Sequence, residues 1–403
     1  MSDRPSSSPP INAGHVPGGS YIYGIDLIRF ICAVSVAAFH LSWQEPNQPW
    51  GLPFGWVGVQ VFFVISGLVI ANSAFGSTGR KFVEGRFLRL YPAAWCALVA
   101  NVFFLAVTPA GVYVLHGIRV LLTPKAVIGS LILMGQWRVA TAYWTLPIEF
   151  AFYGIVALLL FARRFNNVQF WAVLLVLWSL PYLGLLGFTN IAWIHAKPFL
   201  FGYGVKNLTL LRHGCYFGLG MLIWAWKERL TTWLGLAACG AAVVLAWVEI
   251  LDRAREIEPH LLNARFAGLG LTPVSLAILA YGAFLSAVIG LVFSVRFNAR
   301  FPQNERIRSM VRLLGLTTYP FYLLHECVGG FVLDRINRLG AGPGESLIAA
   351  LLAIGVLAAL IAAYAEPKLR KVLKPAGTQP AQRSFAAAPA AASQPAGSNS
   401  DAV

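Results

Sequence analysis

The chain has 403 residues, of which 58% are hydrophobic and only 12% are charged, and its mean hydropathy is +0.66. A soluble domain carries about twice that share of charge, so the composition excludes an ordinary soluble protein and predicts an all-α, polytopic integral membrane helix bundle. The formal net charge of +15 does not indicate nucleic-acid binding, because basic loops on the cytoplasmic side of a membrane protein give the same excess.

The apolar runs divide the chain into a membrane domain and two tails. Residues 1–20 and 375–403 are rich in small residues and Pro, and we expect them to be disordered cytoplasmic tails. No signal-peptide pattern precedes the first run, so we expect the first helix to be retained. The domain at 21–374 is predicted to contain about ten transmembrane helices, at roughly 22–43, 55–75, 87–109, 143–162, 168–188, 209–226, 231–250, 271–295, 311–333 and 346–365.

The first predicted span carries three ionisable residues, Asp26, Arg29 and His40. Arg29 and His40 are about three helical turns apart and therefore share one face, and Asp26 is within ion-pairing reach of Arg29. Ionisable groups in hydrocarbon cost roughly 3 kcal/mol or more each, so they usually face a protein interior or a wet cavity. This face is a candidate functional site, and the alternative is a structural Asp–Arg pair beside a packed histidine.

A second cluster of charge precedes the third span. Arg86 and Arg89 are three residues apart and lie on one face of a helix, where two guanidinium groups can bind phosphate. The alternative is that they anchor the helix at lipid headgroups. Further along, the moderately apolar run at 118–135 is interpreted as an interfacial helix, a re-entrant helix or an eleventh span.

Two later spans add polar residues near their outer ends. Glu149 and His40 are predicted at similar depth, so that the carboxylate could orient the imidazole, although Glu149 could instead pair with backbone or an arginine. His325 is either a second member of this site or a core histidine. The five cysteines fit neither a zinc-site nor a disulfide spacing, so no metal is expected. The other histidines fall in the tail or loops and receive no role.

Loop charge predicts the orientation. With the N-terminus in the cytoplasm, the inner loops hold more Lys and Arg than the outer loops. The bias therefore favours a multi-pass protein of the inner (plasma) membrane with both termini in the cytoplasm. An eleventh span at 118–135 would reverse the membrane orientation of every later span. It would put the strongly basic 296–312 loop on the outer side, which the charge bias argues against.

Together, five stretches resemble acyltransferase family 3, a family of membrane-bound O-acyltransferases that modify surface glycans and other acceptors. They are Asp26–Arg29 with His40, GWVGVQVFFVISGLVI at 55–70, RFLRLYP at 86–92, WTLPIEFAFY at 144–153 and LGLTTYPFYLLHE at 314–326. One departure is Leu27, where the family often has Gly. The resemblance implies a cytoplasmic acyl-CoA donor, an essential histidine at His40 and an arginine pair at Arg86 and Arg89. Many relatives carry a fused hydrolase-like domain that is not expected here.

The residues and the resemblance lead to one hypothesis. The protein would move an acyl group, expected to be acetyl, from acyl-CoA (acetyl-CoA), a co-substrate rather than a bound cofactor, to a carbohydrate hydroxyl, aided by polysaccharide-biosynthesis partners. His40 would be the general base and Glu149 would orient it, with Arg29 and His325 completing the catalytic set. Arg86 and Arg89 would hold the CoA phosphates. A covalent acyl-histidine route stays open, as do a flippase of a lipid-linked glycan and a ligand-binding sensor.

Overall fold

The computed structural model describes residues 21–42, 52–108, 112–115, 118–133, 138–188, 203–261 and 272–374, and the two expected tails lie outside these residues. Its helices are α1 (Tyr23–Ser42), α2 (Gly58–Ala74), α3 (Gly79–Ala106), α4 (Pro124–Ile132), α5 (Leu146–Phe161), α6 (Val168–Phe188), α9 (Tyr203–Leu208), α10 (Gly214–Lys227), α11 (Trp233–Leu261), α12 (Pro273–Arg296), α13 (Glu305–Leu324), α14 (Cys327–Arg338), α15 (Pro343–Leu360) and α16 (Glu366–Leu373). The shorter elements are the 3₁₀ turns η1 (Gly55–Val57), η3 (Thr141–Thr145) and η5 (Asn298–Arg300), the π turn η6 (Ile361–Ala365) and the strands β1 (Val112–Leu115) and β2 (Ile118–Leu121).

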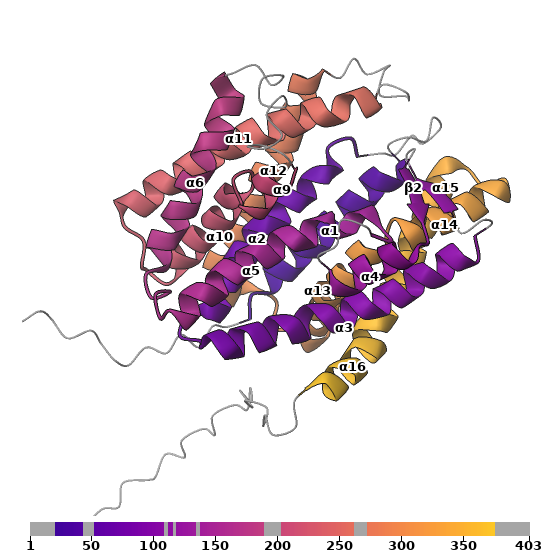
Figure 1. Ribbon diagram of the computed structural model, residues 1–403, viewed down its shortest axis with the longest axis horizontal. Coiled ribbons are helices and arrows are strands. Elements are labelled where there is room, and N and C mark those ends of the chain that lie inside the picture. Colours follow the sequence, from indigo (N-terminus) through magenta and orange to yellow (C-terminus); the bar gives the residue numbers. More distant parts are fainter. Residues whose placement is uncertain are drawn as a thin grey trace, which may run out of the picture.

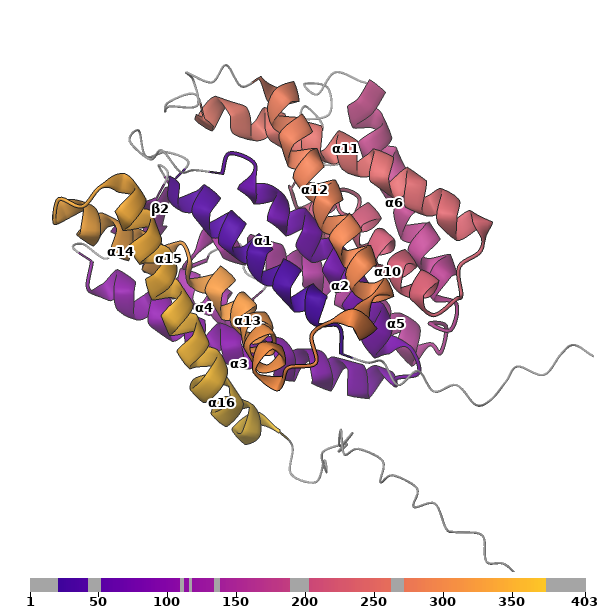
Figure 2. The ribbon, with the colours of Figure 1, turned by 180° about the vertical axis from the view of Figure 1, so that it is seen from behind.

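The helices form one polytopic bundle, as the sequence predicts. Within the described residues, 8 helical segments are long and apolar enough to cross a membrane. They correspond to the first five, the seventh, the eighth and the tenth of the spans expected from sequence. Figures 1 and 2 show α1 and α2 in the middle of the bundle, with α6, α11 and α12 on one side and α3, α13 and α15 on the other.

The sixth expected span, 209–226, is not a full transmembrane helix. Its helical part is α10, which has 14 residues and is therefore about 21 Å long, short of the roughly 30 Å of a bilayer core. The turn before it contains Arg212 and His213, both buried in the protein. Close packing compensates for the short length: a Cβ added to Gly220 would lie 1.9 Å from the Val64 carbonyl oxygen of α2. Only a residue without a side chain allows that approach.

The ninth expected span, 311–333, is divided between two helices. Helix α13 contains Pro320 and ends at Leu324, and α14 begins at Cys327. Side chains satisfy carbonyl groups at this break, because Asn101 donates to the Leu323 oxygen at 2.9 Å and His325 Nδ1 lies 2.6 Å from the Tyr322 oxygen. The last carbonyl groups of a helix need such partners. The break therefore directs polar side chains into the bundle.

The segment 118–135 does not form an eleventh span. Strand β2 pairs with β1 in an antiparallel hairpin, and α4 has 9 residues. A helix of that length is about 13 Å long and cannot cross a bilayer. Of the interpretations given above, a short interfacial or re-entrant helix agrees with the structure.

Candidate active site

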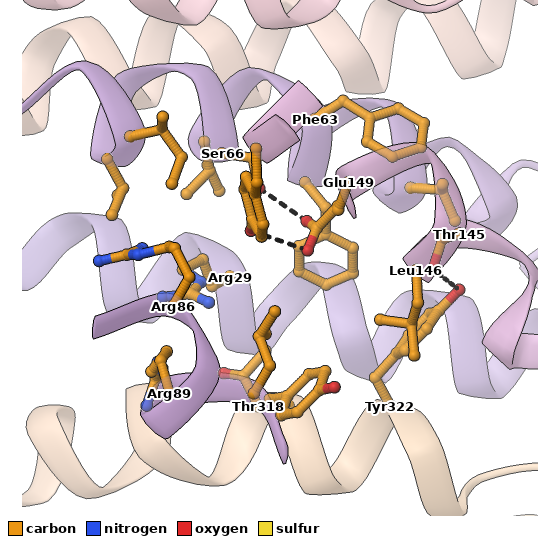
Figure 3. Close-up of a pocket in the computed structure, with 18 residues that line it drawn as sticks. Arg29, Phe63, Ser66, Arg86, Arg89, Thr145, Leu146, Glu149, Thr318 and Tyr322 are labelled. Carbon is orange, nitrogen blue, oxygen red and sulfur yellow. Dashed lines mark hydrogen bonds between the residues drawn. The ribbon is translucent and has the colours of Figure 1, made fainter. Parts of the chain in front are cut away.

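Arginines line one end of a cavity of about 100 Å³ between α1, α2, α3, α5 and α13. Arg29 comes from α1, and Arg86 and Arg89 come from α3, one helical turn apart as expected. Figure 3 shows the three side chains on one side of the cavity, with Thr145 and Tyr322 on the opposite side. The sequence interpretation grouped Arg29 with His40, but the structure groups it with the two arginines expected to bind phosphate.

The arginine end of the cavity has unused hydrogen-bond donors. The Nε atoms of Arg29 and Arg86 are buried, and neither has a hydrogen-bond partner among the described residues. Arg89 is better satisfied, since its Nη1 lies 4.0 Å from a carboxylate oxygen of Glu366 in α16. A buried donor without a partner costs about 1–3 kcal/mol. Two such donors on guanidinium groups facing one cavity indicate an anionic ligand.

Glu149 lies in this same cavity, in the first turn of α5. Its carboxylate accepts hydrogen bonds from Ser66 Oγ at 2.7 Å and from the Tyr153 hydroxyl at 2.9 Å. The expectation that Glu149 orients His40 therefore needs correction, because these partners hold the carboxylate beside the arginines. With three guanidinium groups and one carboxylate, the charges of these four side chains sum to a positive value.

A second cavity, of about 360 Å³, continues from the first and shares Arg29, Val69 and Arg89 with it. It adds two further basic residues, Lys227 at the end of α10 and Arg312 near the start of α13. Basic side chains therefore follow one path through both cavities. Such a path suits a ligand with several anionic groups and an elongated shape.

Asp26 also lines the second cavity, but it does not form the ion pair expected from sequence. No contact within ion-pair distance joins it to Arg29, and its carboxylate instead accepts a hydrogen bond from the Tyr21 hydroxyl. The carboxylate is also closely packed against Gly315 of α13, where a Cβ would lie 2.2 Å from its carbon. Asp26 thus helps to pack the start of α1 against α13.

His40 and His325 meet, although 285 positions separate them in the chain. Nδ1 of His40 lies 2.9 Å from Nε2 of His325, and the ring planes differ by 16°. His325 is fully buried, whereas His40, in the last turn of α1, is partly exposed. The structure thus brings together two of the four candidate catalytic residues and places Arg29 and Glu149 in the cavity described above.

Among the described residues, a carboxylate that lies close to the histidine pair belongs to Glu326, which the sequence analysis did not select. Its carboxylate lies within 4.8 Å of the ligand nitrogens of both histidines. It accepts hydrogen bonds from the Thr141 hydroxyl and from the backbone N–H of Ala142, at 2.9 Å for the latter. Glu326 therefore ties the α13–α14 break to the start of η3. Only its position next to His325 in the chain could have indicated from the sequence that Glu326 belongs to the site.

Tyr322 connects the cavity to the histidine pair. Its side chain lines the cavity and its hydroxyl lies 3.4 Å from Thr145 Oγ1, while its backbone oxygen contacts His325 Nδ1. The arginines thus lie at one end of the cavity, and the histidine pair lies just beyond the other. This arrangement suits a reaction in which an anionic donor is held at one end and a proton is transferred near the other.

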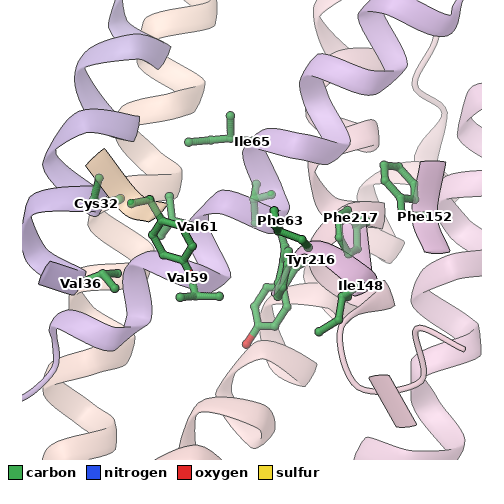
Figure 4. Packing of buried hydrophobic residues seen from close by; sticks show 14 of the residues in the cluster. Cys32, Val36, Val59, Val61, Phe63, Ile65, Ile148, Phe152, Tyr216 and Phe217 are labelled. Atoms are coloured by element: carbon green, nitrogen blue, oxygen red, sulfur yellow. The ribbon is translucent and has the colours of Figure 1, made fainter. Parts of the chain in front are cut away.

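A buried charge network lies behind the cavity wall, and sequence reasoning missed it. Arg212 contacts Glu249 at 2.8 Å, Asp252 at 3.0 Å and Glu256 at 3.0 Å. Figure 4 shows the buried aromatic cluster that includes Phe63, Phe217 and Tyr216. Phe63 lines the cavity, and the Tyr216 hydroxyl donates a hydrogen bond to Glu249 of the network at 2.8 Å. Arg212 falls at the start of the sixth expected span, 209–226, and this position gave no signal that it would be buried among carboxylates.

Comparison with known proteins identifies the family of this chain. A family model described as an acyltransferase domain matches residues 22–365. The chain is also 30% identical over 124 residues to a Bacillus subtilis (strain 168) protein named "Putative peptidoglycan O-acetyltransferase YrhL". That stretch covers 29% of this chain and 18% of the relative, so the chain matches less than a fifth of that protein's length. No solved structure matches. Because the family match extends over most of the described helices, the chain belongs to acyltransferase family 3.

Proposed function

We propose that this protein transfers an acyl group, expected to be acetyl, from acyl-CoA to a hydroxyl group of a carbohydrate. The observation that carries the proposal is the cavity with Arg29, Arg86 and Arg89 at one end and the His40–His325 pair beyond Tyr322 at the other. Guanidinium groups bind phosphates in a forked geometry, and CoA carries its phosphates far from its thioester. The positive path through both cavities suits such a donor.

In this proposal His40 takes the proton from the acceptor hydroxyl. The hydroxyl oxygen then attacks the thioester carbonyl carbon, the new C–O bond forms and the C–S bond breaks. The thiolate of CoA leaves and receives the proton from the His40 imidazolium, so that atoms and charges balance. Proton transfer by a positioned base typically contributes about 10²–10⁴-fold to a rate. Arg29 belongs with the donor-binding residues here.

The acceptor we propose is a glycan of the cell envelope. The name of the Bacillus subtilis relative specifies peptidoglycan O-acetylation, which supports a sugar hydroxyl as the acceptor class. Proteins of polysaccharide biosynthesis would then deliver the acceptor at the inner membrane. The test compares ester groups on envelope glycans, by mass spectrometry, in a strain with and without this protein. Loss of esters from exported glycan is expected, whereas loss of glycan export itself would favour a flippase.

Replacing Arg86 with Gln should weaken donor binding. Each charge-assisted hydrogen bond contributes roughly 1.5–3 kcal/mol, so the dissociation constant for acyl-CoA should rise about 10–100-fold. Isothermal titration with the purified protein measures it. Arg80→Gln is the matched control on the same helix. The Arg80 side chain is 84% exposed and pairs with Glu84 at the surface, away from the cavity. Equal affinities in the two variants would reduce Arg86 to a membrane anchor.

The proposed orientation puts both termini and the arginine end of the cavity in the cytoplasm, where acyl-CoA is made available. Leu339, between α14 and α15, is 81% exposed, and Gln303, before α13, is also exposed. A membrane-impermeant maleimide added to intact cells should label Leu339→Cys and leave Gln303→Cys unlabelled. The reverse pattern would put the donor cavity on the wrong side of the membrane for acyl-CoA.

A further inference from the structure

We propose that His325 is a positioning residue that fixes the tautomer and orientation of His40. This inference rests on the proposed function, in which His40 takes the acceptor proton. It starts from one contact: Nδ1 of His325 lies 2.6 Å from the backbone oxygen of Tyr322. A carbonyl oxygen can only accept a hydrogen bond, so Nδ1 of His325 must carry a hydrogen.

The tautomer of His40 follows from that of His325. With its hydrogen on Nδ1, a neutral His325 presents the lone pair of Nε2. The partner at 2.9 Å is Nδ1 of His40, which must therefore be the donor. A neutral histidine has one N–H, so Nε2 of His40 carries the lone pair. Two contacts thus determine which nitrogen of His40 acts as the base.

The ring geometry supports a shared hydrogen rather than loose contact. The ring centres are 5.0 Å apart and the planes differ by 16°. The 2.9 Å contact and the two centre-to-nitrogen lengths add up to little more than this separation. Both nitrogens therefore lie close to the line joining the ring centres, with the N–H of one ring directed at the lone pair of the other, as a strong hydrogen bond requires.

A metal ion is the alternative that this cluster raises, because His40, His325 and Glu326 offer three ligand atoms within 4.8 Å of one another. Two lone pairs bound to one metal converge on it at an angle, whereas these nitrogens point at each other along a line. The Glu326 carboxylate already accepts from Thr141 and Ala142. The geometry therefore favours a proton shared between the rings, and metal content becomes one outcome of the test.

The pair would act during proton transfer as follows. Nε2 of His40 accepts the acceptor proton, and the imidazolium that forms keeps its Nδ1–H bond to the neutral His325. The nearby Glu326 carboxylate favours that positive charge electrostatically. When the CoA thiolate leaves, it takes the proton from Nε2 and returns both rings to their starting tautomers. His325 acts through His40 and forms no bond with substrate.

A series of substitutions at His325 tests this role in the full-length purified protein. A Gln side chain extends far enough to accept from His40 Nδ1–H, whereas an Asn side chain can still reach the Tyr322 carbonyl but puts no acceptor beside His40. His325→Asn and His325→Ala should therefore lower kcat about 10²-fold, the effect of a misplaced catalytic group, with the KM for acyl-CoA unchanged. The kcat of His325→Gln should fall by clearly less than that of His325→Asn. The control is His213→Gln, which removes another buried histidine and should leave kcat unchanged.

Two results would overturn the inference: His325→Asn with wild-type kcat, or His325→Gln no better than His325→Asn. A stoichiometric metal ion in wild-type protein that is absent from His325→Gln would replace it with a metal site. Nitrogen-15 spectra of histidines in the wild-type protein, assigned with His40→Gln, test the tautomer even if variants misfold. Protonated Nδ1 in His40 is expected, and protonated Nε2 contradicts it. If His40→Gln itself stayed active, the proposed function would fail instead.

Discussion

Replacing His40 with Gln is expected to lower the rate of acyl transfer by about 10²–10⁴-fold, the range over which a general base contributes. Gln is similar in size to histidine, but it cannot accept the acceptor proton. His40 lies in the last turn of α1 and is partly exposed, so its loss should leave the fold intact. The measurement is initial-rate transfer of labelled acetyl from acetyl-CoA.

The control for this variant is donor binding, since the arginine end of the cavity contains neither histidine. Expression level, melting temperature in detergent and affinity for CoA should match the wild-type protein. A variant that had lost affinity for CoA would show that His40 supports the cavity rather than the chemistry. Near-normal turnover would mean that another group, such as Glu149, takes the proton.

Replacing Arg212 with Met should cause the largest loss of stability. The Arg212 side chain is 5% exposed and contacts three carboxylates. Removing one partner of a buried ion pair typically costs about 3–5 kcal/mol, because the charges left behind remain buried. We expect a melting temperature in detergent lower by several degrees, with residual protein still able to bind CoA.

Arg212→Lys and Arg80→Met complete that comparison. Lysine keeps the charge but cannot direct separate N–H groups at Glu249, Asp252 and Glu256, so its melting temperature should fall between those of wild type and Arg212→Met. Arg80 forms its ion pair on an exposed helix surface, where its loss should be undetectable. If Arg212→Met melted like Arg80→Met, the buried network would contribute nothing to stability.

Much of the fold follows from the lengths of the apolar runs, since a run of about 20 residues matches the bilayer core. The sixth and ninth expected spans are exceptions, and both depend on tertiary contacts. Arg212 is buried beside α11 because three carboxylates there neutralise it, and the sequence puts it at the edge of a span. The break after Leu324 depends on partners from α3 and η3, including Asn101 and Thr141. Neither partner is near the break in sequence.

The candidate site was predictable to the extent that it depends on helical spacing. Arg86 and Arg89 share a face because they lie one turn apart in α3, and both line the cavity. Contacts between distant segments could not be inferred from depth alone. His40 and Glu149 were predicted at similar depth in the membrane, but His40 contacts His325 and Glu149 accepts a hydrogen bond from Ser66. Rotation of each helix about its axis decides such contacts, and the sequence does not specify it.

The most direct measurement is transfer of radiolabelled acetyl from acetyl-CoA to envelope glycan by the purified protein reconstituted in lipid vesicles. Wild-type protein and His40→Gln are compared at saturating donor, and alkali-labile label on the glycan is counted. The proposed mechanism predicts labelled ester with wild-type protein and at most about one hundredth of that rate with His40→Gln. Equal label with both proteins, or none with a wild-type protein that binds acetyl-CoA in the presence of glycan, would contradict it.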